Sequence, residues 1–537
     1  MRGENLDMSS VLPSEGHSQH GRRLRLWVAI VLGVGITARV VRYALRFPLW
    51  YDEAALSASL LDRGFLELLR PLDCGQVAPI GYLWSQLAVV KLLGFSEPVL
   101  RLSALAGGVA SVVLFWRLAD RLLGGMAAAL AAGMLAVSYP AIRYSAEAKP
   151  YGLDLLAAVA LVALVGRWLA GPAQSRWLWI SAMAVPVALV VSFPAVFVAG
   201  GVSVAVAWAL AWQRAGRKWW AWAAYNVAAL GAFVAVQSAA AANLSQVGAA
   251  TLQAYWKNAF PPSDSLGALV RWLAASHTGP MLAHPVGGDH GGSIATALLC
   301  LAGVWELLRR RQGALLLVLI APWGLNLVAA ALHRYPYGGH VRVAMHLAPS
   351  VCLLAGAGLA AVLARLRPAQ GANPRAVAAV AVLAALGAGT IVRDVARPAR
   401  SANDLRARAF AQWFWVSKAL DGELVCARSD LHLPFTHTPL LEGDEAIFYC
   451  NQRIYSPRHA RGLPPQWERV SPVWPLRCVW FRVPWLPLDQ EAFDQWLTQM
   501  QGPYRLVRRD SYPLPVFNKR GLESANTVEV FEFVPRP

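Results

Sequence analysis

The side chains best suited to chemistry are two adjacent carboxylates in the stretch Trp50-Tyr51-Asp52-Glu53. They follow a hydrophobic stretch that runs from Leu24 to about Ala44. A carboxylate that is partly sheltered from water at a membrane boundary can act as a general base. A second polar group, with Glu147, Lys149 and Tyr151, follows a later hydrophobic stretch. If both groups lie on the same side of a membrane, they outline one polar site.

A third loop, from His333 to Arg342, is rich in side chains that can bind an anion. Its paired glycines, Gly338 and Gly339, allow close approach of the backbone. Its Arg and His side chains, His340 among them, offer hydrogen-bond donors for an anion. A carboxylate base beside such cationic groups at a membrane surface suits one type of reaction. That reaction moves a group from a membrane-borne phosphate to an acceptor hydroxyl or amine.

Composition indicates a membrane protein that positions these loops with transmembrane helices. Of the 537 residues, 56% are hydrophobic and only 15% are charged, whereas a soluble protein of this size needs more polar surface. The fold class that we predict is mainly α, a polytopic membrane helical bundle with about 11 spans. The predicted spans lie near 24–44, 99–118, 125–142, 151–169, 177–192, 194–212, 219–240, 291–308, 313–332, 343–364 and 375–393.

The distribution of basic residues predicts the orientation of the bundle. The net charge is +18 overall, and residues 1–393 carry +16 of it, in short clusters between apolar spans. Arginines before the first span place the N-terminus inside, and each later loop predicted to be inside also carries basic residues, as the positive-inside rule requires. We interpret residues 79–94 as a helix at the outer interface, because a further span there would reverse every later loop. All three loops with candidate site residues then face outward. Because the basic residues lie in short clusters between apolar spans, nucleic acid is a poor candidate partner.

Residues 394–537 form a separate region with short β-rich runs punctuated by prolines. Helices near 402–420 and 490–499 complete a predicted small α/β domain, which the span count places outside the cytoplasm. Its three cysteines, Cys426, Cys450 and Cys478, allow one disulfide with one thiol left over. The predicted organisation is a disordered cytoplasmic N-terminus (1–20), a transmembrane domain (21–393) and an extracytoplasmic α/β domain (394–537). No cleavable signal peptide is expected.

Three motifs together carry a resemblance to a known family. They are the Asp-Glu pair after the first span, the Glu147-x-Lys149-Pro-Tyr151 element after the third, and the Tyr335-Pro-Tyr-Gly-Gly loop that ends at Arg342. In order and sidedness they resemble the bacterial branch of the family 39 and related glycosyltransferases of the GT-C fold. That group includes the dolichyl-phosphate-mannose–protein mannosyltransferases and the aminoarabinose lipid A transferases. The resemblance covers roughly residues 20–395.

The resemblance implies an inverting glycosyltransferase that uses a polyprenyl-phosphate-linked sugar. Its acceptor is a protein, lipid or glycan on the extracytoplasmic side of the plasma (inner) membrane. The base is then Asp52, and Arg342 lies near the donor phosphate. Many relatives have Arg where this chain has Lys149, which still pairs with phosphate but without the planar fork of a guanidinium. The residues expected to line the substrate cavity are Glu53, Glu147, Lys149, Tyr151, His340 and Arg342.

Several of these residues also have a purely structural interpretation. Asp52 is suited to N-cap a helix that starts at Glu53, and Glu147 and Lys149 are suited to pair within their loop. Tyr151 is suited to anchor a span at the interface. No zinc or nucleotide-binding motif is present, and the sequence leaves any cofactor undetermined. The alternative function is a transporter or flippase for a lipid-linked substrate, which requires charged residues near the bilayer midplane and internal repeats.

Overall fold

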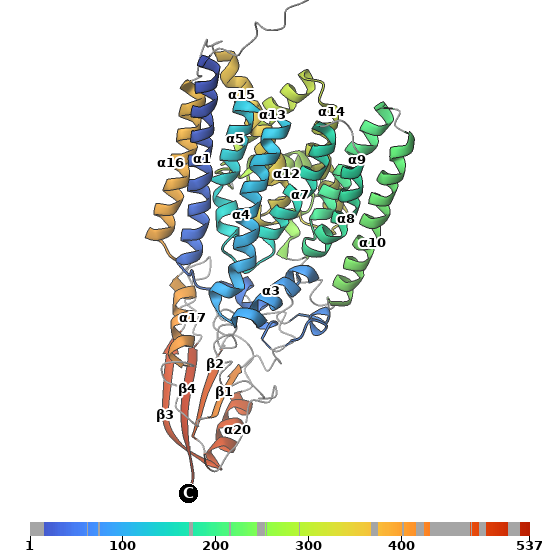
Figure 1. Cartoon of the computed structure of the whole chain (residues 1–537). Helices are drawn as coiled ribbons and strands as arrows, with labels where there is room; N and C mark the ends of the chain where they lie inside the picture. The colour runs from blue at the N-terminus through green and yellow to red at the C-terminus, as the bar shows by residue number, and fades with distance from the viewer. Residues whose placement is uncertain are drawn as a thin grey trace, which may run out of the picture.

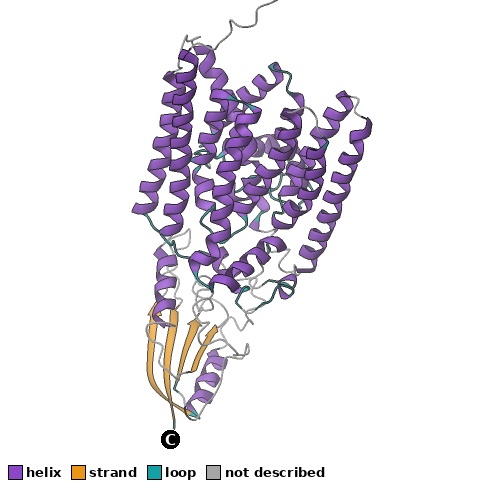
Figure 2. Ribbon diagram, viewed as in Figure 1, coloured by secondary structure: helices purple, strands orange, loops and turns teal. Residues whose placement is uncertain are grey.

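The chain folds into a bundle of long helices with a small sheet at one end, as the computed structural model shows (Figures 1 and 2). The described residues are 15–61, 63–72, 76–170, 175–213, 216–243, 253, 255–288, 290–366, 374–399, 402–414, 424–429, 473, 475–482, 490–513 and 527–537. Helix α1 begins at Glu15, so the prediction of disorder over residues 1–20 was wrong for residues 15–20. Residues 1–14 lie outside the described part of the chain.

Eight helices in the described part of the chain are long and apolar enough to cross a membrane. Several present large apolar side chains on their outer surface, such as Val227 and Leu230 of α10, as helices do when lipid surrounds them. The protein is therefore a multi-pass membrane protein. The eight spans are formed by α1 (Glu15–Ala44), α4 (Glu97–Leu122), α7 (Tyr151–Ala170), α9 (Ala195–Gln213), α10 (Trp219–Asn243), α14 (Gly313–Ala331), η7 with α15 (Val341–Leu347 and Ala348–Leu366) and α16 (Pro374–Ala396).

Three of the eleven predicted spans contain shorter helices. They are α5 (Gly125–Ala136), α8 (Arg176–Val191) and α13 (Ile294–Arg309), with 12, 16 and 16 residues. Roughly 20 apolar residues are needed to cross the hydrocarbon core, so these three are short for a complete crossing. They nevertheless stand beside the long helices in the bundle (Figure 1). The helical bundle is thus confirmed, whereas the count of eleven full-length spans is not.

Helix α5 is short because it ends inside the protein. Its residues from Ala128 to Ala136 are all buried, and the chain then turns into the short helix α6 (Tyr139–Tyr144), with Pro140 in its first turn. Arg39 of α1 donates hydrogen bonds to the carbonyl oxygens of Ala136 (2.6 Å) and Leu135 (3.3 Å). Helix ends within a membrane need such partners, because no water is available for the last carbonyls. A buried cation therefore supports the break between α5 and α6.

Glycines allow close contact between helices α13 and α15. A Cβ atom on Gly303 would collide with the carbonyl oxygen of Leu354, and one on Gly358 would collide with that of Leu299. Small residues of this kind let helix backbones approach within membranes. The two buried cysteines of the bundle, Cys300 and Cys352, lie on the same two helices and are free thiols.

The remaining helices connect the spans, and α3 lies across one end of the bundle (Figure 1). It has 14 residues, which fits the interpretation of residues 79–94 as an interfacial helix instead of a span. The connecting helices are α2 (Tyr51–Ala58), η2 (Glu67–Leu69), α3 (Ile80–Leu93), η4 (Gly216–Lys218), η5 (Lys257–Ala259), α12 (Leu266–Thr278) and η6 (Pro280–Leu282).

The C-terminal region contains a four-stranded sheet with strand order β1-β2-β4-β3. Strands β1 and β2 are parallel, and the other pairs are antiparallel. Cys478 of β2 is disulfide-bonded to a partner outside the described side chains, and Cys450 also lies outside them. The small α/β region is thus confirmed. Its elements are α17 (Ala402–Gln412), β1 (Leu424–Ser429), β2 (Leu476–Arg482), α20 (Gln490–Gln501), β3 (Tyr504–Pro513) and β4 (Thr527–Pro535).

The sheet region packs against the loop that follows α1. Phe414, Val479 and Val530 share a buried apolar cluster with residues of α2 and α3, Ala54 and Tyr82 among them. Arg408 of α17 adds polar contacts to the carbonyl oxygen of Arg46 (2.6 Å) and to the Glu97 carboxylate (3.1 Å). The sheet therefore supports the end of the bundle where the first two carboxylates lie.

Candidate active site

Asp52 lies in the first turn of the short helix α2. The helix begins at Tyr51 with Trp50 as its N-cap, and the Trp50 backbone N–H donates to the Glu53 carboxylate at 3.3 Å. The prediction that Asp52 caps a helix beginning at Glu53 was therefore wrong. Glu53 takes part in the capping instead, which leaves the Asp52 side chain to point elsewhere.

Glu53 holds three segments of the chain together. Its carboxylate accepts hydrogen bonds from Arg101 of α4, at 2.8 and 2.7 Å, and from the backbone N–H of Ala148, at 2.6 Å. Burial raises the pKa of the Glu53 carboxyl, and the charge of Arg101 opposes that rise. Because Glu53 is 1% exposed and both oxygens are engaged, the geometry argues against the predicted substrate contact. These contacts suit a supporting role beside Asp52.

The carboxylate of Asp52 faces the third loop, 290 positions along the chain. Its Oδ2 atom accepts a hydrogen bond from Nη1 of Arg342 at 2.8 Å. The Asp52 side chain is 20% exposed, and that of Arg342 is 7% exposed. The structure thus brings the predicted base and the predicted phosphate-binding residue into direct contact.

An aromatic enclosure surrounds the guanidinium of Arg342. The rings of Trp50, Tyr255 and Trp256 lie 5.4, 5.8 and 5.2 Å from its central carbon. The Tyr255 hydroxyl accepts a hydrogen bond from Nη2 at 2.9 Å, whereas the buried Nε atom of Arg342 has no partner in the described structure. A buried donor without a partner is costly, and a ligand or a water molecule can satisfy it.

Lys149 adds a second buried cation to the site. Its Nζ atom donates to the amide oxygen of Gln76 at 2.8 Å, and the residue is 5% exposed. Burial lowers the pKa of the Lys149 ammonium; Arg342 adds to that effect, and the nearby Asp52 opposes it. These electrostatic interactions place Lys149 in the same cluster as Asp52 and Arg342.

Glu147 lies beside this cluster and contacts its walls. It pairs with Arg143 at 2.8 Å and accepts a hydrogen bond from Nε1 of Trp50 at 3.2 Å. Because Trp50 forms one wall around Arg342, Glu147 fixes that wall in place. These contacts suit a supporting role for Glu147, and its predicted substrate contact remains a proposal.

Tyr151 and His340 meet on the other side of the cluster, through Tyr144. The Tyr144 ring lies 5.0 Å from the ring of Tyr151, and its hydroxyl lies 3.4 Å from Nδ1 of His340. The same nitrogen accepts a hydrogen bond from the backbone N–H of Arg342 at 3.2 Å. His340 therefore caps η7, which carries Arg342, and Tyr144 contacts both His340 and Tyr151.

The structure also assigns roles to residues that sequence reasoning missed. Arg101 lies inside a predicted span, and a charged residue within a span is a signal that marks a structural or functional partner. Tyr255 and Trp256 lie in a long loop without a motif, so no sequence signal pointed to them. Gln76 carried no signal either. Among the residues that the structure describes, no group of three His, Cys, Asp or Glu side chains could hold a metal ion.

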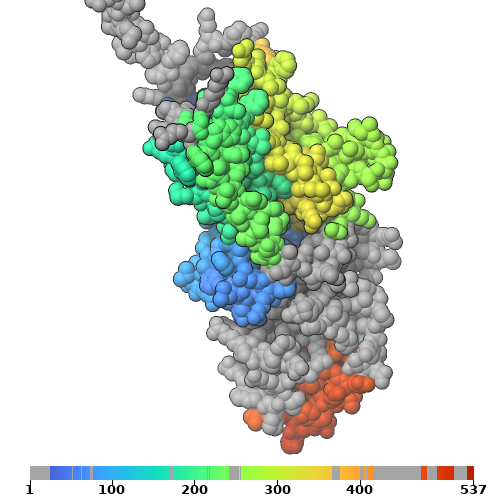
Figure 3. Space-filling model, turned by 90° about the vertical axis from the view of Figure 1, so that its right-hand side faces the viewer, coloured from blue at the N-terminus to red at the C-terminus, as the bar shows by residue number. Residues whose placement is uncertain are grey.

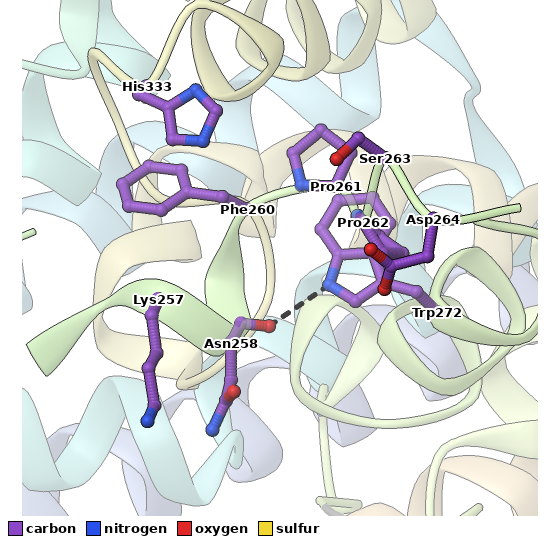
Figure 4. A pocket seen from close by; sticks show the side chains of 9 residues that line it. All are labelled: Lys257, Asn258, Phe260, Pro261, Pro262, Ser263, Asp264, Trp272 and His333. Carbon is purple, nitrogen blue, oxygen red and sulfur yellow. Dashed lines mark hydrogen bonds between the residues drawn. The ribbon is translucent and has the colours of Figure 1, made fainter. Parts of the chain in front are cut away.

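A hollow of about 360 Å³ opens beside the segment that carries Tyr255 and Trp256 (Figure 4). The light-green part of the chain to which it belongs projects from the flank of the bundle in Figure 3. The ring of His333 lies 4.9 Å from that of Phe260, and Nε1 of Trp272 donates to the Asn258 carbonyl at 3.0 Å. The hollow is lined by Lys257, Asn258, Phe260, Pro261, Pro262, Ser263, Asp264, Trp272 and His333.

Comparisons with known proteins identify a family and solved structures that this chain resembles. Residues 77–239 match the family described as dolichyl-phosphate-mannose-protein mannosyltransferase. The crystal structure of ArnT from Cupriavidus metallidurans in the apo state matches with a TM-score of 0.53 and 14% identity, over 94% of this chain and 97% of that one. The same protein bound to undecaprenyl phosphate matches with a TM-score of 0.54 and 14% identity, over 94% and 98%. No curated protein sequence matches the chain. The predicted resemblance to the GT-C glycosyltransferases and the GT-C-like fold are therefore confirmed.

Proposed function

We propose that this chain is an inverting glycosyltransferase that moves a sugar from a polyprenyl phosphate to an acceptor hydroxyl or amine. The observation that carries the proposal is the cluster at the end of the bundle. The Asp52 carboxylate lies 2.8 Å from Arg342, and Lys149 is buried nearby. The Nε atom of Arg342 has no partner among the described residues. One base beside two cations suits a reaction that takes up a proton and releases a phosphate.

The proposed reaction is a single displacement at the anomeric carbon. An acceptor oxygen or nitrogen forms a bond to that carbon while the bond from the carbon to the phosphate oxygen breaks. The electron pair of the broken bond stays on the phosphate, next to Arg342 and Lys149. The acceptor proton passes to the Asp52 carboxylate and later to water. Attack opposite the leaving group inverts the configuration of the sugar.

Both substrates reach the site from the extracytoplasmic side in this proposal. The positive-inside distribution of basic residues supports that orientation. The disulfide of Cys478 supports it as well, because disulfides persist in oxidising compartments and the sheet packs against the site-bearing loop. The proposal includes a transmembrane glycosyltransferase domain at 21–393, an extracytoplasmic domain at 394–537 and a location in the inner membrane.

The donor that we propose is a sugar linked to undecaprenyl phosphate. That lipid phosphate is bound by ArnT, which shares the fold of this chain. The acceptor in the proposal is a protein, lipid or glycan outside the cytoplasm. The transporter alternative has less support among the described residues. Arg39 is engaged in capping a helix, and Asp154 lies in the first turn of α7, near the site.

A direct assay tests the proposal. The purified full-length chain, in detergent, is incubated with a panel of undecaprenyl-phosphate sugars and extracts of bacterial envelope lipids and proteins. We expect release of undecaprenyl phosphate with one or a few donors. Release should require the wild-type residue at position 52. If no donor in the panel yields lipid phosphate, while the reconstituted protein moves such lipids between leaflets, the transporter alternative is correct.

A further inference from the structure

We infer that the hollow beside the segment with Tyr255 and Trp256 is a subsite for a sugar unit of the acceptor. A sugar unit here means an uncharged ring that carries several hydroxyl groups and has an apolar face of C–H groups. The inference rests on the proposed function. It deepens that function, because it selects acceptors that carry a carbohydrate beside the hydroxyl or amine that is modified.

The polar side chains that line the hollow are available to a ligand. Lys257, Ser263 and Asp264 are exposed, and among the described residues none of these three side chains has a hydrogen-bond or ion-pair partner. Lys257 and Asp264 carry opposite charges and line the same hollow, yet they do not pair with each other. The volume of about 360 Å³ lies within the range of about 300–1,000 Å³ that is usual for small-molecule sites. The hollow therefore offers both the space and the free polar groups that a ligand needs.

The mixture of charges in the hollow selects an uncharged ligand that is rich in hydroxyl groups. An anion would be attracted by Lys257 but repelled by Asp264, and a cation would meet the reverse. A hydrocarbon chain would displace water from these polar groups without replacing its hydrogen bonds, which is costly. A hydroxyl group can donate to the carboxylate and accept from the ammonium, so a ring with several hydroxyl groups satisfies both side chains.

The apolar part of the hollow suits the C–H face of a sugar ring. Figure 4 shows Phe260 and His333 on one side of the hollow and Trp272 on the other. Nε1 of Trp272 donates to the carbonyl oxygen of Asn258 at 3.0 Å, which fixes the plane of the indole ring. Aromatic rings supply a large and rigid contact surface, because only two torsion angles orient each of them. The hollow thus combines a flat apolar surface with polar groups, as an amphipathic sugar ring requires.

The hollow and the proposed active site share a short segment of the chain. The rings of Tyr255 and Trp256 lie 5.8 and 5.2 Å from the central carbon of Arg342, and the next residue, Lys257, lines the hollow. Because consecutive Cα atoms are only about 3.8 Å apart, the hollow lies next to the enclosure of the proposed phosphate-binding residue. A sugar unit in the hollow therefore holds one part of the acceptor while its reacting hydroxyl or amine lies at Asp52.

Ser263→Trp tests the inference, because the indole would occupy the space of the sugar ring. Ser263 is exposed, so the larger side chain should not disturb the core. The probes are methyl hexosides and their 2-acetamido derivatives, and the measurement is saturation-transfer difference NMR of the full-length protein in a detergent without a sugar head group. We expect wild type to bind at least one probe and Ser263→Trp to lose that binding. The matched control is Ala274→Trp, which adds the same ring at an exposed position of α12 outside the hollow.

Asp264→Asn tests the polar contact without changing the shape of the hollow. The loss of a charge-assisted hydrogen bond to a sugar hydroxyl should weaken binding of the same probe about tenfold. Asp120→Asn is the matched control, because Asp120 is an exposed carboxylate near the other end of the bundle, 23 positions after Glu97 in α4. If no probe binds wild type, or if Ser263→Trp and Asp264→Asn bind the probe as wild type does, the inference is refuted.

A transfer assay separates this inference from the proposed function. The KM for a glycan-bearing acceptor should rise at least tenfold in Ser263→Trp, whereas the KM for the lipid-linked donor should stay unchanged. If wild type releases undecaprenyl phosphate but Ser263→Trp leaves the KM for every acceptor unchanged, or if only peptide acceptors are modified, the acceptor subsite is wrong and the glycosyltransferase proposal stands. If the hollow binds a sugar probe but no donor yields lipid phosphate, the proposed function fails and the role of the hollow in acceptor binding fails with it.

Discussion

Replacing Asp52 by Asn tests the assignment of the base most directly. The amide oxygen of Asn still accepts a hydrogen bond from Arg342, but the side chain no longer takes up a proton. Loss of a general base costs about 10²–10⁴ in rate, or about 2.7–5.5 kcal/mol of transition-state stabilisation. The fold should change little, because the Asp52 side chain is 20% exposed and the Asn amide oxygen still accepts the hydrogen bond from Arg342.

The assay measures release of undecaprenyl phosphate at several donor concentrations, together with the melting temperature of the detergent-solubilised protein. Asp120→Asn is the matched control, because Asp120 is an exposed carboxylate near the other end of the bundle. A folded Asp52→Asn protein that retains more than about a tenth of wild-type kcat would refute the role of Asp52 as base.

Three further predictions concern charge, stability and sidedness. Burial lowers the pKa of Lys149 from its ordinary value of 10.5, so donor affinity should be greatest while Lys149 is protonated and should fall as the pH rises through that pKa. Calorimetry from about pH 7 to 10 measures this decline. In Lys149→Arg the decline should disappear, because the guanidinium stays charged over this range. Arg101→Met leaves the buried Glu53 carboxylate without its ion-pair partner and should lower the free energy of unfolding by about 3–5 kcal/mol, seen as a lower melting temperature. Adding Glu53→Gln should restore part of that stability. Equal melting temperatures of Arg101→Met and wild type would contradict the role of this ion pair. In a background without reactive native thiols, Ser263→Cys should react with a membrane-impermeant thiol reagent from outside and Arg121→Cys should not, and the reverse pattern would overturn the orientation.

Sequence reasoning identified the three loops of the site but could not determine how their side chains pair. The Asp-Glu pair, the Glu147–Tyr151 element and the third loop each stood out through charged residues between apolar stretches. Asp52 and Glu53 are adjacent in helix α2, so a shift of one residue along the helix would decide which of the two carboxylates faces Arg342. Glu53 completes the capping of α2 and binds Arg101, whereas Asp52 turns to Arg342. That difference arises from tertiary contacts with α4 and the second loop, which composition does not encode.

The span count was limited by a similar effect. Hydropathy does not distinguish a helix surrounded by lipid from one surrounded by protein. Helix α5 was predicted as part of an 18-residue span, but it has 12 residues, because Arg39 of another helix stabilises its early end. The partners of Arg342 were equally inaccessible, since Tyr255 lies in a loop without periodicity. The end of α5 and the partners of Arg342 both depend on polar contacts between segments that are distant in the sequence.

The contact between the sheet and the first loop has a consequence for how the protein matures. Val530 of β4 belongs to the same apolar cluster as Ala54, two residues from Asp52. During synthesis the first loop emerges more than 400 residues before this strand does. The contact that supports the loop with Asp52 and Glu53 is therefore incomplete until the sheet has been synthesised and folded. An unfinished chain in the membrane would hold the site residues without their final geometry, so biogenesis itself would delay activity until the whole protein is assembled.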